Sequence, residues 1–345
     1  MVENGKYDFF TSGIKKYKID HYAFLGPALT IAGNGATVGY MHYADGFFNA
    51  YQRTYVLTEL LGDRTFLFST INRKLQKKIQ QEARAGNIPY IVLDMLTELD
   101  IYLPSLEEQI QIGNFFKQLD DTIALHQGTL EKYQKLKVSY LEKMFPKENE
   151  LYPELRFPNF TDAWEQRKLG EIVDVFDGTH QTPKYTDKGI MFLSVEDIKT
   201  LKSEKYISEE DFKKEFKYFP EIGDVLMTRI GDVGTTNVIC STQPIAYYVS
   251  LALLKNKNSD PYFLSTVISS GSVQSDIWKR TLHIAFPKKI NKSEIEKVII
   301  PLPSYVEQTQ IGNFFKQLDD TIALHQREVE KYKKIKQSYL EKMFI

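Results

Sequence analysis

The sequence has few of the features that mark secreted, membrane or strongly basic proteins. Its 345 residues include one cysteine, Cys240, which excludes an internal disulfide framework. No apolar run approaches the roughly 20 residues that a membrane-spanning helix needs, and residues 1–6 are too polar for a signal peptide. The formal net charge of -1 excludes a general polycation, so any nucleic-acid surface must be local. We therefore expect a cytoplasmic protein that does not bind a membrane.

Motifs for catalysis are also missing. No Asn/Asp-Pro-Pro-Tyr/Phe methyltransferase motif occurs, and the turns at Gly33 and Gly231 lack the Gly-Lys-Ser/Thr of a phosphate loop. Glu196, Asp197 and Lys199 match an acid-x-Lys nuclease pattern, but so short a pattern is common by chance. We predict no catalytic residue, no metal site and no bound cofactor on this chain.

The informative feature is a duplicated segment. Residues 105–145 read SLEEQIQIGNFFKQLDDTIALHQGTLEKYQKLKVSYLEKMF, and residues 304–344 repeat them at roughly four positions in five. A copy this long indicates two equivalent structural units. The blocks before and between the copies differ in sequence, so variable and constant parts alternate along the chain.

Apolar residues in each copy follow the heptad spacing of a coiled coil, in alternating steps of four and three. The seam runs through residues 112–144 and 311–343 and includes His126 and His325, where a polar residue usually fixes helix register. At about 1.5 Å per residue, each copy would extend about 60 Å as a helix. We predict that the two helices pair with each other. The alternative is two amphipathic helices buried in separate domains.

The predicted fold class is α+β, with mixed domains between the helices. Short β-rich runs separated by glycines occupy residues 190–195, 224–229, 237–240 and 247–254, and residues 260–277 have a helical pattern. We predict five segments, namely a first mixed domain at 1–104, a helix at 105–145, a proline-containing linker at 146–163, a second mixed domain at 164–303 and a helix at 304–345.

The two variable blocks share one skeleton. Residues 28–32 and the glycine-rich turn after them match residues 224–234, residues 51–58 match 247–254, and residues 101–105 match 300–304. Phe9 matches Phe192, which lies 28 positions after Trp164, yet only eight residues precede Phe9. We therefore expect the first domain to be shortened by roughly 20 residues.

These residues resemble the specificity (S) subunit of type I restriction-modification systems. The resemblance covers the whole chain and rests on three motifs: the L-P-S-x-x-E-Q-x-Q-I-G-N-F-F-K-Q-L-D-D-x-I blocks from Leu103 and Leu302, the W-E-Q-R-K-L-G-E-I opening at Trp164, and the G-D-V-L-M-T-R-I-G-D-V-G turn from Gly223. It implies two target-recognition domains, the first one N-terminally shortened. These domains would alternate with two conserved helices that pair as an antiparallel coiled coil.

The resemblance further implies a non-catalytic subunit that reads a bipartite target on double-stranded DNA. Two modification (methyltransferase) subunits would dock on the conserved helices and methylate adenine, and restriction subunits would join to translocate and cleave. S-adenosylmethionine, ATP and magnesium are expected on those partner subunits. Docking is expected at Phe115, Phe116, Leu119 and Ile123 in the first helix and at Phe314, Phe315, Leu318 and Ile322 in the second.

Candidate DNA contacts are basic and polar side chains in loops and on one helix face, because phosphates attract basic groups and base edges pair with amides. In the second domain they are Thr179, His180, Gln181, Lys184, Tyr185, Arg229, Lys279, Arg280, Lys288 and Lys289. In the first domain they are Lys15, Lys16, Asn34, Gln52 and Arg53 in loops, with Lys74 and Lys77 on a helix. A structural salt bridge is the alternative for Arg229, and a solvated face is the alternative for the basic stretch from Lys279.

Two other classes of function stay open. A self-contained nuclease or methyltransferase with a duplicated specificity region would cut or methylate DNA without partners. A coiled-coil scaffold would bind no duplex, even with its partners present.

Overall fold

A computed structural model describes residues 2, 4–82 and 90–344 of the chain. The chain divides into two compact units: unit 1 comprises residues 1–129 and 325–345, and unit 2 comprises residues 130–324. This division passes through both long helices, whereas the predicted boundaries keep each helix whole. Each unit is therefore an α+β body that includes part of both helices.

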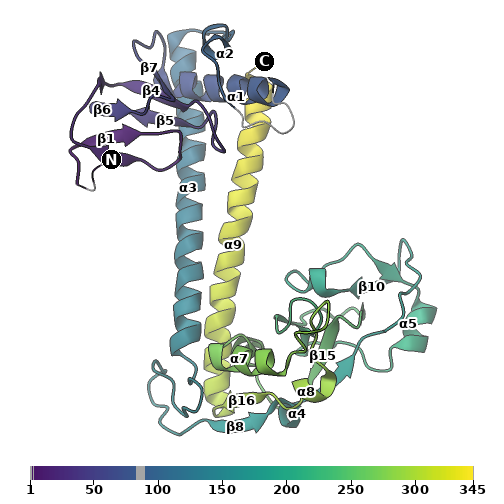
Figure 1. Ribbon diagram of the computed structural model, residues 1–345. Coiled ribbons are helices and arrows are strands. Elements are labelled where there is room, and N and C mark those ends of the chain that lie inside the picture. Colours follow the sequence, from purple (N-terminus) through teal and green to yellow (C-terminus); the bar gives the residue numbers. More distant parts are fainter. Residues whose placement is uncertain (1, 3, 83–89, 345) are drawn as a thin grey trace. The chain divides into compact units, whose positions relative to one another are not determined.

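Unit 1 contains two small sheets and a covering helix (Figure 1). One sheet has the order β2 (Tyr17–Ile19), β1 (Tyr7–Phe10), β6 (Phe47–Ala50), β3 (Phe24–Leu25), and the other has the order β5 (Met41–Ala44), β4 (Ala28–Ala32), β7 (Thr54–Leu57). The helices of this block are α1 (Arg64–Glu82) and the short α2 (Asp94–Thr97). Strand β4 is buried along its whole length, and its Leu29 and Ile31 share a core with Phe66, Ile71 and Leu75 of α1.

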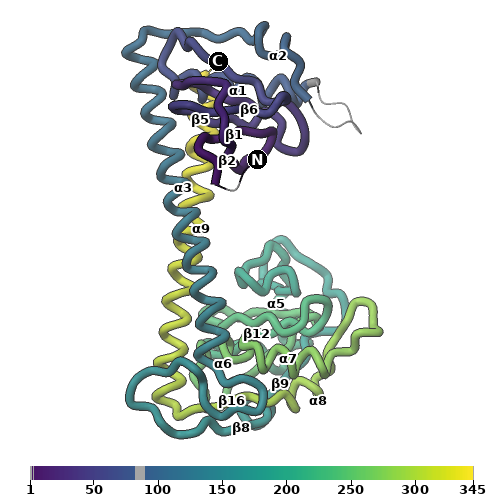
Figure 2. The backbone as a smooth tube through the Cα atoms, turned by 60° about the vertical axis from the view of Figure 1, so that its left-hand side comes forward, coloured from purple at the N-terminus to yellow at the C-terminus, as the bar shows by residue number. Residues whose placement is uncertain are grey.

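Unit 2 has the same kinds of element and more strands, and Figure 2 traces its backbone. Its sheets are β13 (Thr236–Val238), β12 (Val225–Thr228), β15 (Leu251–Asn256), β9 (Val173–Asp177); β11 (Tyr206–Ile207), β10 (Ile190–Leu193), β14 (Ile245–Tyr247); and β8 (Glu165–Lys168) paired with β16 (Ile299–Leu302). The helices are α4 (Leu169–Ile172), α5 (Glu209–Glu215), α6 (Pro261–Ile268), α7 (Gly271–Arg280) and α8 (Lys292–Ile295), with a 3-10 turn at Val195–Asp197. Val225 and Leu254 of the central sheet share the main core with Phe263 and Val267 of α6.

Two long helices pass through both units, and both begin with the same cap. Helix α3 spans Leu106–Lys143 and α9 spans Tyr305–Met343, within two residues of the predicted bounds. The Ser105 hydroxyl accepts a hydrogen bond from the Glu108 N–H (3.3 Å), and the Ser304 hydroxyl accepts one from the Glu307 N–H (3.4 Å). A serine at this position satisfies an N–H that the first helical turn leaves unpaired.

In unit 1, α3 and α9 pair in opposite directions (Figure 1). Phe115 of α3 packs edge-on against Tyr339 near the end of α9, with 5.0 Å between the ring centres. Further along α3, Asp120 pairs with the earlier Lys336 of α9 (2.5 Å). As α3 advances, its partners step back along α9, so the helix pair is antiparallel.

Unit 2 repeats these contacts with the helices exchanged. Phe314 of α9 packs edge-on against Tyr140 of α3 at 5.0 Å, and Asp319 pairs with Lys137 (2.5 Å). These are the copies of Phe115, Tyr339, Asp120 and Lys336. Each unit thus contains an antiparallel pair made by the same residue types.

The recurring histidines contact each other within unit 1. The Nδ1 atoms of His126 and His325 are 2.9 Å apart, which requires one ring to donate and the other to accept. The His126 ring also stacks on Tyr332, with 5.7 Å between ring centres. These polar side chains lie in the predicted seam, between the two helices.

A hydrogen-bonded joint, made by a glutamine, holds the variable domain of unit 1 on its helix. The Gln109 amide donates to the Pro104 carbonyl (2.8 Å) and its oxygen accepts from the Asp63 N–H (3.0 Å). The Asp63 carboxylate in turn caps α1 by accepting from the Phe66 N–H (2.8 Å). In unit 2 the corresponding three bonds, at 2.9, 3.2 and 2.8 Å, involve Gln308, Pro303, Asp260 and Phe263.

A glycine on each long helix lets this joint close. A Cβ at Gly113 would lie 2.7 Å from the Phe66 nitrogen, and one at Gly312 would lie 2.8 Å from the Phe263 nitrogen. Real Cβ atoms do not approach a backbone nitrogen so closely, so a side chain would push the domain off its helix. The copied Q-x-Q-I-G motif therefore encodes the attachment of each domain.

Backbone hydrogen bonds show which residues of the two units correspond. The Tyr51 N–H bonds to the Phe10 carbonyl, as the Tyr248 N–H bonds to the Leu193 carbonyl, both at 2.8 Å. Tyr51 therefore corresponds to Tyr248, and the predicted match with Tyr247 is wrong by one residue. Two adjacent tyrosines in unit 2 made both alignments look alike in the sequence.

The predicted match of Phe9 with Phe192 is confirmed by strand pairing. Strand β1 pairs parallel with β6, with Phe9 opposite Asn49, and β10 pairs parallel with β14, with Phe192 opposite Ala246. Strands β8 and β9 of unit 2 have no counterpart in the described part of unit 1. Both strands come from the opening segment after Trp164.

We expect alanine substitutions at three helix glycines to show whether close packing at the joint matters more for stability than the higher helix propensity of alanine. At Gly128 nothing lies within 4 Å of a built Cβ, so Gly128→Ala should stabilise the protein by about 1 kcal/mol. At Gly113 and Gly312 the collision should outweigh that gain and destabilise the fold by about 1–3 kcal/mol. Thermal unfolding of the three variants measures the difference, and a similar rise in Tm for all three would contradict the proposed role of the joint.

Candidate nucleic-acid interface

Three loops of unit 2 meet around the side chain of Arg229. Its Nη1 pairs with Asp177 Oδ1, and its Nε donates to the Ile290 carbonyl (3.3 Å). Asp177 precedes the loop at 178–185, Arg229 precedes the turn at 230–234, and Ile290 follows the loop at 281–289. The ion pair and the hydrogen bond to Ile290 therefore hold the ends of all three loops in place relative to one another.

This arrangement corrects the prediction that Arg229 contacts DNA. The residue is only 6% exposed, and its N–H continues the sheet by bonding to the Ser250 carbonyl (2.9 Å). Its guanidinium group points into the domain and is occupied by Asp177 and Ile290. The alternative reading, a structural ion pair, describes Arg229.

The turn at 230–234 brings two predicted lysines to the same place. Gly231 and Gly234 have φ values of 81° and 96°, a region that favours glycine. The Gly231 N–H bonds to the Lys288 carbonyl (2.9 Å), and Lys289 forms a β-bridge with Ile230. Lys288 and Lys289 are both exposed and make no ion pair within residues 4–82 and 90–344. They can offer positive charge to a phosphate.

The loop at 178–185 presents most of the other predicted contacts. His180, Gln181, Lys184 and Tyr185 are exposed. Thr179 is half-buried, and its hydroxyl donates to the Glu215 carboxylate (2.8 Å), so it is less free to meet DNA. An amide, an imidazole and a lysine on one loop suit contacts to base edges and phosphates.

Sequence reasoning missed two apolar side chains on the loop at 281–289. Ile284 and Phe286 are 99% and 104% exposed, next to Lys288 and Lys289. Apolar side chains of this kind can insert between base steps when a protein binds the minor groove. In the sequence they could have been noticed as an isolated Ile and Phe within an otherwise basic stretch.

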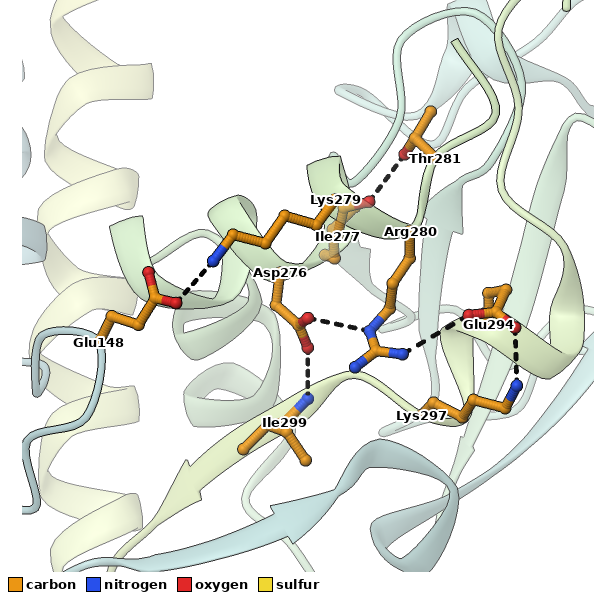
Figure 3. Close-up of polar contacts among 9 residues, drawn as sticks. All are labelled: Glu148, Asp276, Ile277, Lys279, Arg280, Thr281, Glu294, Lys297 and Ile299. Carbon is orange, nitrogen blue, oxygen red and sulfur yellow. Dashed lines mark hydrogen bonds and ion pairs between the residues drawn. The ribbon is translucent and has the colours of Figure 1, made fainter. Parts of the chain in front are cut away.

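Figure 3 shows that two basic residues predicted to contact DNA form ion pairs with carboxylates of unit 2. Lys279 pairs with Glu148 (2.5 Å), and Arg280 contacts both Asp276 (2.9 Å) and Glu294 (3.5 Å). Lys297 lies 2.7 Å from Glu294 and lowers the pKa of that carboxyl. Their charges are largely balanced inside unit 2, whereas those of Lys288 and Lys289 are not.

Three loops of unit 1, at 11–16, 33–39 and 51–53, also meet. The Ser12 hydroxyl donates to the Arg53 carbonyl (3.1 Å), and the Thr37 hydroxyl donates to the Ser12 carbonyl. Asn34, Gln52 and Arg53 line a hollow of about 290 Å³ beside these loops. The structure thus brings together three predicted contacts that lie far apart in the sequence.

Lys15 and Lys16 add positive charge to the same loops. Both are exposed, and the Lys16 ammonium lies 5.3 Å from the centre of the Phe10 ring. His42 Nε2 lies 3.3 Å from the Gly13 carbonyl on the same loop. Burial lowers the pKa of His42, the Gly13 contact opposes this, and the charge of Lys16 lowers the pKa further. The lowered pKa favours the uncharged form of His42, so the lysines provide the positive charge of these loops.

Lys74 and Lys77 lie on α1 and are not part of the three loops. Lys77 is exposed, and the Lys74 ammonium lies 4.6 Å from the centre of the Tyr102 ring. Lys74 and Tyr102 line a separate hollow of about 590 Å³, to which the three loops contribute no residue. DNA contacts by these two lysines stay a prediction.

The predicted partner-docking residues pack inside the chain. Phe116 and Phe315 are 0% exposed, and Ile123 and Leu318 are 7% and 8% exposed. Phe115, Phe314, Leu119 and Ile322 are half-buried, the two phenylalanines against Tyr339 and Tyr140. Docking at the four buried residues is therefore wrong, because this apolar seam is used by the helix pair itself.

A different set of copied residues faces outward on α3 and α9. Leu125 is 69% exposed and its copy Leu324 is 49% exposed. The ion pair between Lys117 and Asp121 (2.6 Å) recurs between Lys316 and Asp320 (2.6 Å). We call this set the copied helix face, and its members are Asn114, Lys117, Gln118, Asp121, Leu125, Asn313, Lys316, Gln317, Asp320 and Leu324.

Two kinds of feature are absent from the described residues. No helix among them is long and apolar enough to cross a bilayer. Nor do three or more His, Cys, Asp or Glu side chains gather there in a way that could hold a metal ion.

Two duplicated α+β units with polar loop clusters, built on an antiparallel helix pair, match one class of protein, the DNA-specificity subunits. The sequence profile of the type I restriction modification DNA specificity domain matches residues 2–135 and 161–335. The chain therefore belongs to this family.

Relatives in sequence and structure agree with this assignment. The chain is 22% identical to the type I restriction enzyme MjaVIII specificity subunit of Methanocaldococcus jannaschii, over 81% of this chain and 68% of that protein. It is 24% identical to the EcoDI specificity subunit of Escherichia coli, over 91% of this chain and 76% of that protein. The crystal structure of the type I S subunit from M. genitalium superposes with a TM-score of 0.73 at 18% identity, covering 100% of this chain and 90% of that one. At this identity the structural likeness shows the fold.

We expect Arg229→Met to destabilise unit 2 strongly while an exposed lysine on the neighbouring loop tolerates the same change. Removing Arg229 leaves Asp177 without its partner and should cost about 3 kcal/mol. Lys184→Met should change stability by less than about 0.5 kcal/mol. Denaturant unfolding followed by circular dichroism tests this, and equal midpoints for the two variants would show that Arg229 does not anchor the loops.

Proposed function

We propose that the chain reads a bipartite DNA target, with one half-site contacted by the loops of each unit. The observation that carries this proposal is the repeated design: the same joint and the same strand pairing support loops of unrelated sequence. In unit 2 the readers are the loop at 178–185 with Lys288 and Lys289, and in unit 1 they are Asn34, Gln52, Arg53 and the lysines of the loop at 11–16. Different loops on equal frames suit two different half-sites.

The length of the helix pair suits a spacer between the two sets of DNA contacts. Half-sites one helical turn of DNA apart are separated by about 34 Å on one face, and a helix as long as α3 extends about 57 Å at 1.5 Å per residue. A helical spacer keeps its length, whereas a flexible linker would not fix the number of base pairs between the halves. We therefore assign the fixed gap of the target to α3 and α9.

The partner subunits dock, in this proposal, on the copied helix face. Its residues are identical in both copies and exposed, apart from the half-buried Lys316, which suits two identical modification subunits, with restriction subunits joining the complex. S-adenosylmethionine, ATP and magnesium would be bound by those partners. The chain itself would contribute recognition and no catalytic group.

We expect Lys288→Ala with Lys289→Ala to weaken binding to the DNA target and to reduce its salt dependence. Loss of two phosphate contacts should lower the slope of log K against log salt by about 2. The control is Lys143→Ala with Lys147→Ala, which removes the same charge from lysines beside Glu154, outside the three loops. Fluorescence anisotropy with a duplex that carries the target measures both. An unchanged slope in the loop variant, or an equal loss in the control, would contradict the assignment.

We expect Leu125→Glu with Leu324→Glu to abolish docking of the modification subunits, because a charge would enter each apolar contact. Either substitution alone should leave one subunit bound. Val138→Glu is the matched control, since Val138 is 57% exposed on α3 but is not copied, its counterpart being Gln337. Native mass spectrometry of the mixed subunits counts the bound partners, and two bound partners in the double variant would rule out the copied helix face.

A further inference from the structure

Unit 2 buries a tryptophan at a place where unit 1 is hollow. Trp164 is 1% exposed and lies 6.0 Å, between ring centres, from both Phe145 and Phe263. The corresponding rings of unit 1, Phe344 and Phe66, lie 5.5 Å from each other and border the hollow of about 590 Å³. No tryptophan of the described chain fills this hollow.

The residues around this hollow are more exposed than their copies. Met343 is 39% exposed, whereas its copy Met144, beside Trp164 in the core of unit 2, is 4% exposed. Leu103 is 51% exposed, whereas its copy Leu302 is half-buried in a strand paired with β8. The same apolar side chains are thus covered in one unit and open in the other.

A carboxylate beside the hollow also lacks the partner that its copy has. Glu307 is 1% exposed, and its two oxygens accept bonds from Arg156 Nε (2.7 Å) and Nη2 (2.8 Å). Its copy, Glu108, borders the hollow, is exposed, and makes no ion pair within the described residues. Arg156 belongs to the linker that leads to Trp164, and the described part of unit 1 contains no counterpart of either residue.

A sheet edge is also open in the described part of unit 1. In unit 2, β15 pairs with β12 on one side and with β9 on the other. In unit 1, the equivalent β7 pairs with β4, and no described strand pairs with its other edge. An unpaired edge presents N–H and C=O groups that can accept an added strand.

We propose that unit 1 carries a docking site for a polypeptide segment with the chemistry of residues 151–177. An arginine of that segment pairs with Glu108, a tryptophan fills the hollow that Phe66 and Phe344 help to line, and a strand adds to the free edge of β7. The sequence contains this pattern once, and that copy is seated in unit 2. The occupant of the site in unit 1 is a segment of this chemistry that comes from outside residues 1–345. The proposal rests on the packing of the two units and does not depend on DNA binding.

The test uses the full chain and a fluorescein-labelled synthetic peptide of residues 151–177. Fluorescence anisotropy should show saturable binding of one peptide per chain. A peptide with Trp164→Ala should bind at least about tenfold more weakly, because a central buried aromatic carries much of the energy of such contacts. No saturable binding of the unchanged peptide would overturn the proposal.

Reversing the charges of Glu108 in the protein and of Arg156 in the peptide tests whether the peptide binds at the hollow of unit 1. Glu108→Lys should weaken binding about tenfold, and a peptide with Arg156→Glu should recover most of the loss, since the ion pair is then restored with reversed charges. The control protein Glu107→Lys makes the same charge change at the neighbouring residue, which does not border the hollow. If Glu108→Lys and Glu107→Lys weaken binding equally, or if the exchanged peptide does not recover it, the site is not the one proposed.

Hydrogen exchange separates docking on unit 1 from exchange into unit 2. Bound peptide should protect the amides of β7 and leave those of β15 unchanged. Altered protection at β15, or a native mass that shows a dimer exchanging this segment between two copies, would replace the proposed occupant with a second copy of the chain. Either result would be obtained without DNA, so it leaves the proposed reading of DNA untouched.

Discussion

The structure depends on one hydrogen-bonded joint that is built twice. Gln109 and Gln308 each hold a domain by bonding to a proline carbonyl and to the N–H of a helix-capping aspartate. Gly113 and Gly312 allow the close approach that these bonds require. Because the joint uses no residue of the candidate DNA-contact loops, those loops can diverge without loosening the domain from its helix. This separation of attachment from recognition explains why one sequence motif is nearly constant beside blocks that differ.

The same logic extends to the helices. The ion pair of Asp120 with Lys336 in unit 1 recurs as Asp319 with Lys137 in unit 2. Because the two duplicated helices are antiparallel, each unit contains the same pairs of residue types between its helices. They also present the same outward residues twice, so a single chain offers two equivalent surfaces. The buried seam holds the chain together, and the exposed positions are the ones that remain for partners.

Much of this was readable in the sequence, and the exceptions have physical causes. Duplication and heptad spacing predicted the two helices and their pairing, and β-rich runs between glycines predicted β10, β12, β13 and β15, because such patterns are visible in the local sequence. The inward orientation of the Arg229 side chain was not predictable, since it depends on where Asp177 lies in the folded sheet. Docking was assigned to Phe116 and Phe315 because apolar residues suit either a partner or the other helix, and only the fold shows which contact they make. The identity of exposed positions such as Leu125 was the signal for an outward surface.

The central claim is that two units with different loops read two different half-sites across a fixed gap. Sequencing that detects methylated bases, applied to DNA from cells that contain this chain with its modification subunit, tests it directly. The account predicts one methylated motif made of two unlike short sequences separated by a constant number of unspecified base pairs. A palindromic motif with two copies of the same half would contradict it, because only one kind of unit would then be reading DNA.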